Sequence, residues 1–285
     1  MRHSAQLARR PGVPAHERFH FGPKRHRFAI AVFCINEGNR VRAQLERMAP
    51  LADQADIIVA DGGSSDGSLA PDRLDNFQLR TLLIKRDEGR LSAQMRMAIG
   101  FVIEQGYEGL VVIDGNGKDD VHAIPRFLKL LDEGYDHVQG SRYMHGGRGV
   151  NTPLARHIGV RLVHAPLISI AAHRRYTDTT NGFRAYSRKL LIDPRVSPLR
   201  EIFVGYELHY YLAIRAARLG FKVIETPVTR SYPTGEKAPT KIHGIRGNLA
   251  VLKTLAKVVR GAYNPDPFTR MSFEERLAAE RAEEE

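Results

Sequence analysis

Apolar segments and helical patterns alternate along most of the chain. Short apolar-rich segments predict four strands buried on both faces, at residues 28–35, 57–60, 79–84 and 110–113. Apolar residues at helical spacing predict helices between and after them, at residues 41–48, 89–105 and 124–131. This alternation predicts an α/β fold, with a mostly parallel Rossmann-like sheet and helices on both of its faces.

The second half continues the pattern without an obvious linker. We expect helices at 154–172, 206–219 and 248–260, and strands near 185–186 and at 221–228. One domain spanning residues 28–263 follows from this. Residues 1–27 are rich in Arg, His and Pro with little periodicity, which predicts a disordered basic arm. Residues 264–285 are predicted to be an acidic tail.

The stretch after the fourth predicted strand carries the strongest chemical signal. Asp114 ends the strand, and the glycines at 115 and 117 break it. Asn116 and Lys118 project to the same side as Asp114 if the chain stays extended. Ligands of open α/β sheets bind at the carboxyl ends of strands, and Mg²⁺ is usually held by one or two carboxylates plus substrate phosphates. Asp114 and Asn116 are therefore predicted to hold a metal-bound diphosphate.

The second predicted strand also ends in an acidic, glycine-rich loop, from Asp61 to Ser68. Two such loops in one sheet predict a shared nucleotide crevice. The alternative for residues 114–120 is a polar turn in which Asp119 or Asp120 caps the next helix. That alternative accounts for those two aspartates, but less well for Asp114 and its glycines.

Charge and cysteine content narrow the class of protein. The formal net charge of +11 favours a polyanionic partner, either a nucleotide diphosphate, an anionic membrane or a nucleic acid. Cys34 is the single cysteine, so no disulfide framework is possible and a reducing compartment is expected. No apolar run is long enough to span a bilayer, and no signal peptide is visible. We expect a cytoplasmic protein, soluble or peripheral at the inner face of the membrane.

Several motifs occur together in a recognisable order. They are Asn36-Glu37, the loop from Asp61 to Ser68, Asp114, Gly140-Ser141-Arg142-Tyr143, the loop from Asp178 to Arg184, and Glu207. Together they resemble the family 2 glycosyltransferases, near the branch that makes dolichyl- or polyprenyl-phosphate mannose. The resemblance implies the glycosyltransferase A-type fold, with a nucleotide-sugar half at about 28–143 and an acceptor half at about 144–263.

The resemblance also implies roles for individual side chains. Those expected to bind the nucleotide-sugar are Asn36, Glu37, Asp61, Asp66, Asp114, Asn116, Lys118, Arg142, Arg184, Lys237 and Lys241. If the acceptor is a sugar hydroxyl, a carboxylate must take its proton. Glu207 is the first choice for this catalytic base and Asp178 the second.

The metal site departs from the family pattern. The family usually has Asp at the position of Asn116, and the mannosyltransferase branch has Gln at that of Lys118. A divalent cation, Mg²⁺ or Mn²⁺, is implied by the family. A lysine could supply part of the charge that a second carboxylate would have recruited as metal. We therefore expect Lys118 to lower the dependence on a divalent cation. The alternative is an exposed lysine beside the aspartates that cap the next helix.

The resemblance implies an inverting glycosyltransferase of cell-envelope or polysaccharide synthesis, moving a sugar from a nucleotide-sugar to a polyprenyl-phosphate or glycan acceptor. A sugar nucleotidyltransferase is one alternative, but it would need a basic glycine-rich loop after the first strand, where residues 36–39 are Asn-Glu-Gly-Asn. A nucleic-acid-binding protein is another, but aspartate loops at the strand ends oppose phosphodiester binding, so no nucleic acid is expected.

The acceptor is expected to be membrane-associated. Residues 154–172 form an amphipathic pattern that ends in His173-Arg174-Arg175, and the first 27 residues are basic, which suits an anionic membrane surface. An ordinary buried helix is the alternative for residues 154–172.

Overall fold

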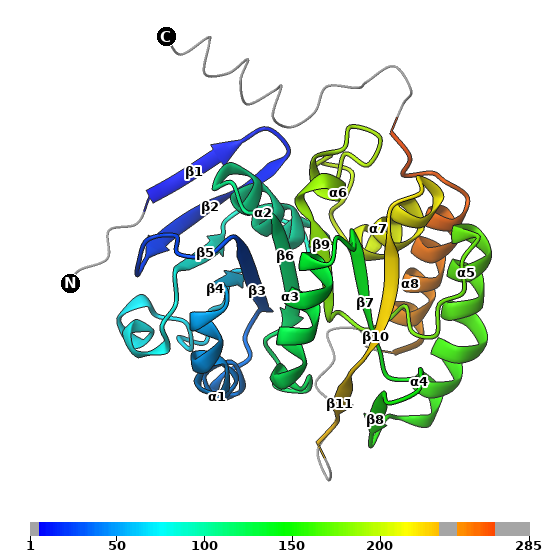
Figure 1. Cartoon of the computed structure of the whole chain (residues 1–285), viewed down its shortest axis with the longest axis horizontal. Coiled ribbons are helices and arrows are strands. Elements are labelled where there is room, and N and C mark those ends of the chain that lie inside the picture. The colour runs from blue at the N-terminus through cyan, green and yellow to red at the C-terminus, as the bar shows by residue number, and fades with distance from the viewer. Residues whose placement is uncertain (1–5, 234–243, 266–285) are drawn as a thin grey trace.

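The computed structural model describes residues 6–233 and 244–265, and its centre is one twisted sheet (Figure 1). Within these residues the sheet has nine strands, in the spatial order β1 (Gln6–Arg10), β2 (Val13–His20), β5 (Thr81–Lys85), β4 (Asp56–Asp61), β3 (Phe28–Cys34), β6 (Gly109–Asp114), β9 (Arg184–Ser187), β7 (His137–Ser141) and β10 (Val223–Pro227). Six strands run parallel to one another: β5, β4, β3, β6, β7 and β10. The strand β9 is antiparallel to both of its neighbours, β6 and β7. The predicted α/β fold with a mostly parallel sheet is confirmed.

Two apolar layers cover the faces of this sheet. Side chains alternate along β3, so Ala29 and Phe33 face one layer while Ile30 and Val32 face the other. The second layer contains α1 (Asn39–Met48) and α3 (Ile124–Asp132). The first contains α2 (Leu91–Glu104), α5 (Ala165–Ala172), α6 (Arg188–Ile192), α7 (Glu207–Arg218) and α8 (Gly244–Val259). Short 3₁₀ turns join the elements at η1 (Ala49–Asp53), η2 (Pro71–Arg73), η3 (Asp75–Phe77) and η4 (Val121–Ala123).

The predicted disordered arm is wrong for residues 6–20, which form a hairpin at the edge of the sheet. β2 pairs antiparallel with β5, and β1 pairs with β2 (Figure 1). The buried Arg18 forms a two-pronged ion pair with Glu104 of α2, at 2.6 and 2.8 Å. Basic composition indicated disorder, but here a partner distant in sequence neutralises the charge, while Val13 and Phe19 supply buried apolar contacts.

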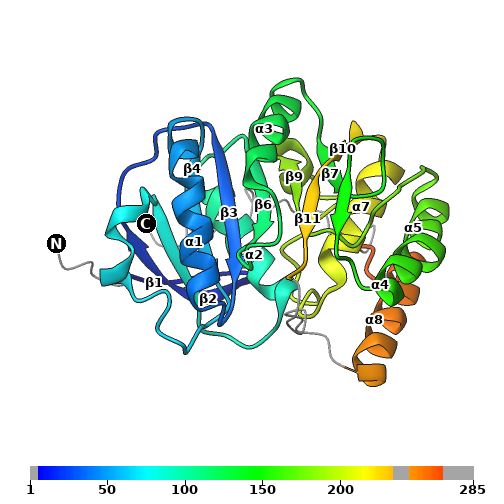
Figure 2. The ribbon, with the colours of Figure 1, turned by 90° about the horizontal axis from the view of Figure 1, so that it is seen from below.

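The other end of the sheet is covered by a helical segment and a small ribbon. α4 (Leu154–Gly159), a π-helical turn η5 (Val160–His164) and α5 run on from one another, where one helix was expected. Figure 2 shows α4, α5 and α8 beside the strands β7 and β10. β8 (Arg148–Val150) and β11 (Thr229–Ser231) pair as a separate two-stranded ribbon. No helix among the described residues has the length and apolarity to cross a bilayer. Most of the predicted acidic tail, residues 266–285, lies outside the described residues.

We predict that Gly100→Ala destabilises the protein by pushing the hairpin off α2. An added Cβ would lie 2.5 Å from a methyl carbon of Val13. Overpacking of this kind costs about 1–3 kcal/mol, against a gain of about 1 kcal/mol in helix propensity. In a Val13→Ala background the clash disappears, so Gly100→Ala becomes neutral or stabilising there. Urea unfolding of the four proteins measures this, and stabilisation by Gly100→Ala in both backgrounds would show that the hairpin does not rest on α2.

Candidate active site

Two polar loops at the carboxyl ends of β3 and β4 are tied together. The backbone N–H of Asn36 donates to the Ser64 hydroxyl at 2.9 Å, and the Asn36 side chain accepts from Ser65 at 2.7 Å. Further along the same two loops, Asp66 accepts a hydrogen bond from the backbone N–H of Gly38 at 2.9 Å. Asn36 and Asp66, both predicted to bind the nucleotide, thus also hold the two loops in register.

Asp61 stabilises the second of these loops by accepting hydrogen bonds from it. Its carboxylate accepts the backbone N–H of Ser64, at 2.9 and 3.0 Å, and the Ser64 hydroxyl at 2.6 Å. The side chain is buried, and burial raises the pKa of Asp61 above its usual value. Its predicted contact with a nucleoside stays a prediction, but its position at the carboxyl end of β4 is the one that was expected.

A cavity of about 370 Å³ opens between these loops and the end of β6. Its charged lining side chains are Glu37, Lys85, Arg90, Asp114, Lys118, Arg156 and Arg230. Cations thus outnumber carboxylates along its wall, although two of the aspartate and glutamate residues predicted to bind the nucleotide-sugar are present. We call this cavity the polar crevice.

Arg230 of β11 reaches the predicted diphosphate residue at the end of β6. One arm of its guanidinium donates to Asp114 Oδ2 at 2.9 Å, and the other pairs with Asp119. Asp119 and Arg230 are both buried. Burial raises the pKa of Asp119 to about 6, even though Arg230 acts in the opposite direction.

Backbone contacts fix Arg230 in this place. β11 pairs with β8 on one side, and Arg230 forms an antiparallel bridge with Asp119 on the other. The flanking hydrogen bonds run from Ser231 N–H to the Lys118 carbonyl at 2.8 Å and from Asp120 N–H to the Thr229 carbonyl at 3.1 Å. Sequence reasoning missed Arg230. The signal that could have found it is a basic residue two positions after the strand predicted for residues 221–228.

Lys118 lies in the polar crevice, as predicted, and is buried. Its ammonium nitrogen is 5.3 Å from the centre of the Tyr232 ring. Burial, together with the nearby Arg230, lowers the pKa of Lys118 to about 8. The site therefore places two cations beside Asp114, one of which was predicted.

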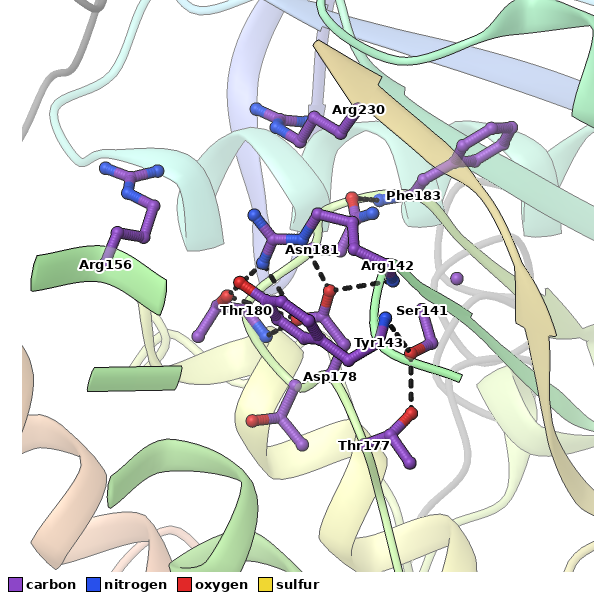
Figure 3. A network of polar contacts seen from close by, with 12 residues as sticks. Ser141, Arg142, Tyr143, Arg156, Thr177, Asp178, Thr180, Asn181, Phe183 and Arg230 are labelled. Carbon is purple, nitrogen blue, oxygen red and sulfur yellow. Dashed lines mark hydrogen bonds and ion pairs between the residues drawn. The ribbon is translucent and has the colours of Figure 1, made fainter. Parts of the chain in front are cut away.

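Arg142 and Asp178 form a buried ion pair (Figure 3). The guanidinium donates to both carboxylate oxygens, at 2.6 and 3.0 Å, and also to the Thr180 hydroxyl at 2.8 Å. Asp178 is completely buried. In this geometry both oxygens of Asp178 are engaged by Arg142, and its role as second choice of base stays a prediction. Arg142 is likewise engaged inside the protein.

Glu207 and Arg184 also turn inward. Glu207 is the first residue of α7, is buried, and accepts the backbone N–H of Gly205 at 2.8 Å. Arg184 is completely buried and donates to the backbone carbonyls of Thr179, Asn181 and His209. The guanidinium predicted to bind a nucleotide-sugar is thus occupied in holding the loop before β9. Lys237 and Lys241 lie outside the described residues.

A second cavity, of about 580 Å³, adjoins the polar crevice, and we call it the apolar cavity. Both are lined by Phe33, Leu91, Asp114, Arg156 and Tyr206. Beyond this shared wall, half of the residues that line the apolar cavity come from α2, α4, η5 and α8, among them His164. The rest include Arg184 of β9 and His209 of α7. A charged site and an apolar site therefore meet at Asp114 and Arg156.

Comparison of the sequence with known protein families assigns this chain to a family. The family model described as glycosyl transferase family 2 matches residues 29–193, more than half of the chain. The protein belongs to glycosyltransferase family 2. It is a glycosyltransferase enzyme with the A-type fold, as the resemblance implied.

Relatives within this family carry more specific names. Polyprenol monophosphomannose synthase of Mycolicibacterium smegmatis is 27% identical over 247 residues, which cover 82% of this glycosyltransferase and 88% of the relative. Dolichyl-phosphate hexose transferase of Haloferax volcanii is 28% identical over 236 residues, covering 81% and 92%. Glucosyl-3-phosphoglycerate synthase from Mycobacterium tuberculosis, solved with Mn²⁺, UDP and phosphoglyceric acid, has a TM-score of 0.58 and 19% identity over 84% of this chain and 80% of its own. This last likeness shows the fold alone.

Solved structural neighbours contain Mn²⁺ or Mg²⁺. The side chains predicted to bind such an ion in this glycosyltransferase do not fit it, because they are engaged by other groups of the protein. Asp114 Oδ2 accepts from Arg230 at 2.9 Å and from the Asn116 amide at 3.4 Å. Asn116 Oδ1 accepts the backbone N–H of Lys118 at 3.2 Å. The predicted ligands Asp114 and Asn116 thus already have protein partners.

We predict that Asp178→Asn destabilises the glycosyltransferase by about 3–5 kcal/mol, because it leaves the Arg142 guanidinium buried without its counter-charge. Asp193→Asn is the matched control, since Asp193 also pairs with an arginine through both oxygens but that arginine, Arg195, is largely exposed. The control is expected to cost no more than about 1 kcal/mol. Thermal and urea unfolding measure both. Unchanged stability with lost turnover would instead support the predicted role of Asp178 as a base.

Proposed function

We propose that this enzyme transfers a sugar, with inversion, from a nucleoside diphosphate sugar to a polyprenyl-phosphate acceptor. The observation that carries the proposal is the meeting of the polar crevice and the apolar cavity along one wall. A lipid phosphate has one charged end and one apolar end. Its phosphate fits Arg156, which lines both cavities, and its chain fits the apolar cavity.

A phosphate acceptor also explains the inward orientation of the predicted bases. A lipid phosphate is already ionised and needs no group to take its proton. Glu207 and Asp178, which are both buried, then serve to position loops. Catalysis rests mainly on stabilising the charge that develops on the leaving diphosphate, which is usually the largest single contribution. Because the metal site does not fit, we derive no step through a divalent cation.

The donor is expected to lie with its nucleoside against the loops after β3 and β4 and its diphosphate beside Asp114. Glu37 lines the crevice and can accept hydrogen bonds from a ribose or base. The relatives named for polyprenol and dolichyl-phosphate products support this donor and acceptor pair. A role in assembling envelope or surface polysaccharides is part of this proposal.

The lipid acceptor implies contact with a membrane surface. Large apolar side chains at helical spacing are exposed along α4, η5 and α5, and more of them lie on α8, as Leu154, Ile158, Leu162, Leu167, Ile170, Leu249 and Leu252. We call these the apolar face. It is continuous with the apolar cavity, which α4, η5 and α8 line, and exposed Arg161, Arg174 and Arg175 flank it. A bilayer with anionic lipids is the occupant that this combination suits.

We predict that Arg156→Ala raises the apparent KM for polyprenyl phosphate by about 10–100-fold, because a hydrogen bond to a charged group contributes about 1.5–3 kcal/mol. The KM for the nucleotide-sugar should change much less. Lys129→Ala is the control, since the Lys129 side chain is exposed on α3 and lines neither cavity. Transfer of radiolabelled sugar to a short polyprenyl phosphate measures both constants. No transfer to any lipid phosphate, with transfer to a glycan, would replace the proposed acceptor.

We predict that Leu162→Asp with Ile170→Asp weakens vesicle binding at least about tenfold, because each apolar side chain gains about 1.5–3 kcal/mol when it leaves water. Both residues are 72% exposed, so folding should not suffer. Leu7→Asp is the control, because Leu7 is 57% exposed at the far edge of the sheet. Flotation with vesicles of neutral and anionic phospholipid measures the effect. Equal flotation of all three proteins would remove the apolar face from the membrane contact.

A further inference from the structure

The guanidinium of Arg230 engages one oxygen of Asp114, the carboxylate that was predicted to bind a metal. Its hydrogen bond to Asp114 Oδ2 is 2.9 Å long, the length of a charge-assisted contact. The second arm is held by Asp119, and the backbone on both sides of Arg230 is hydrogen-bonded. Moving this guanidinium away would leave Asp119 buried with an unpaired charge. The cation beside Asp114 is therefore a fixed part of the protein.

The residue two positions after Asp114 supports the same conclusion. Asn116 is neutral, and its amide donates to the same Asp114 oxygen at 3.4 Å. A single carboxylate that is already paired with an arginine binds a divalent ion weakly, because its charge is already neutralised. A metal placed there would also face the charges of Arg230 and Lys118, and like charges at such short range repel each other.

Tyr232 holds the cations of the site in one cluster. Its hydroxyl accepts from Arg142 and Arg156, each at 3.2 Å. Its ring centre lies 5.3 Å from the Lys118 ammonium and 6.0 Å from the Arg230 guanidinium, within the range of cation–π attraction. Tyr232 is itself buried and hydrogen-bonded through its backbone N–H to Val150 at 3.0 Å. The positive charges are thus preorganised before any ligand arrives.

The charge of the polar crevice suits a diphosphate. Five cationic side chains line it, Lys85, Arg90, Lys118, Arg156 and Arg230, against the two acidic side chains Glu37 and Asp114. Sites with two acidic side chains at this position attract a cation before a diphosphate can enter. Here the protein supplies the excess positive charge itself.

We propose that Arg230 and Lys118 hold the donor diphosphate without a divalent metal, as fixed side-chain cations clustered around Tyr232. This inference rests on the proposed function and deepens it. In the transfer, the bond from the anomeric carbon to the diphosphate oxygen breaks, and its electron pair leaves with the diphosphate. An oxygen of the acceptor phosphate supplies the electron pair of the new bond. The leaving diphosphate gains one negative charge, and the fixed cations neutralise it without reorganising.

Calorimetric binding of UDP, GDP and dTDP in EDTA and in Mn²⁺ tests this inference directly. The nucleotide that binds most tightly is expected to show the same Kd in both buffers within about twofold. Wild-type binding that weakens at least tenfold in EDTA and recovers in Mn²⁺ would overturn the inference alone. If none of these nucleotides bound in either buffer, the proposed function would fall and this inference with it.

Asn116→Asp provides the opposite test, because it restores a second carboxylate without changing the size of the side chain. This variant is expected to bind the nucleotide at least tenfold more weakly in EDTA and to recover in Mn²⁺. Arg230→Met combined with Asp119→Asn removes the cation without leaving a buried carboxylate unpaired, and should bind at least tenfold more weakly in EDTA. Lys129→Met is the control, since the Lys129 side chain is 76% exposed on α3. Wild-type affinity in EDTA for either test variant would contradict the proposal.

Discussion

The ion pairs of Arg230 with Asp114 and Asp119 connect the two halves of the active site. Asp114 ends β6 and Asp119 follows it, in the half predicted to bind the nucleotide-sugar, whereas the guanidinium comes from β11 in the half predicted to bind the acceptor. Removing one partner of a buried pair is costly because it leaves the other charge uncompensated. This constraint fixes the ribbon of β8 and β11 against residues 118–120, and with it Tyr232 and the cations around it. The shape of the polar crevice follows from that attachment.

The central sheet could be predicted because its strands are continuous apolar runs, and a run such as 110–113 carries its own signal. The hairpin of β1 and β2 could not be predicted. An arginine such as Arg18 indicates an exposed position, and only the contact with Glu104 explains why it is buried. The three-residue strand β11 has no period to detect, and its partners are distant in sequence. In both cases a tertiary contact, not local propensity, makes the element.

The motifs located the site better than they described its side chains. Asp114, Asn116 and Lys118 do line one crevice, because the end of a strand fixes where they lie. For Asp178 and Arg184 the motif gave the residue type but not the direction, and both turn inward to satisfy buried partners. A buried charge must find its counter-charge or its hydrogen bonds, and a sequence motif does not show where those partners lie.

The proposed selectivity for a lipid phosphate rests on the order of charged and apolar surfaces. The polar crevice, the apolar cavity and the apolar face follow one another across the same end of the molecule, with Arg156 at the first junction and α4, η5 and α8 at the second. A ligand that spans this path must be anionic at one end and apolar at the other. An acceptor anchored in a bilayer would then reach the donor phosphate without exposing its chain to water, because each apolar segment passes directly from lipid to protein. Fixed cations are well suited to such a site, since they keep their charge in place while the low-dielectric surroundings strengthen their hold on both phosphates.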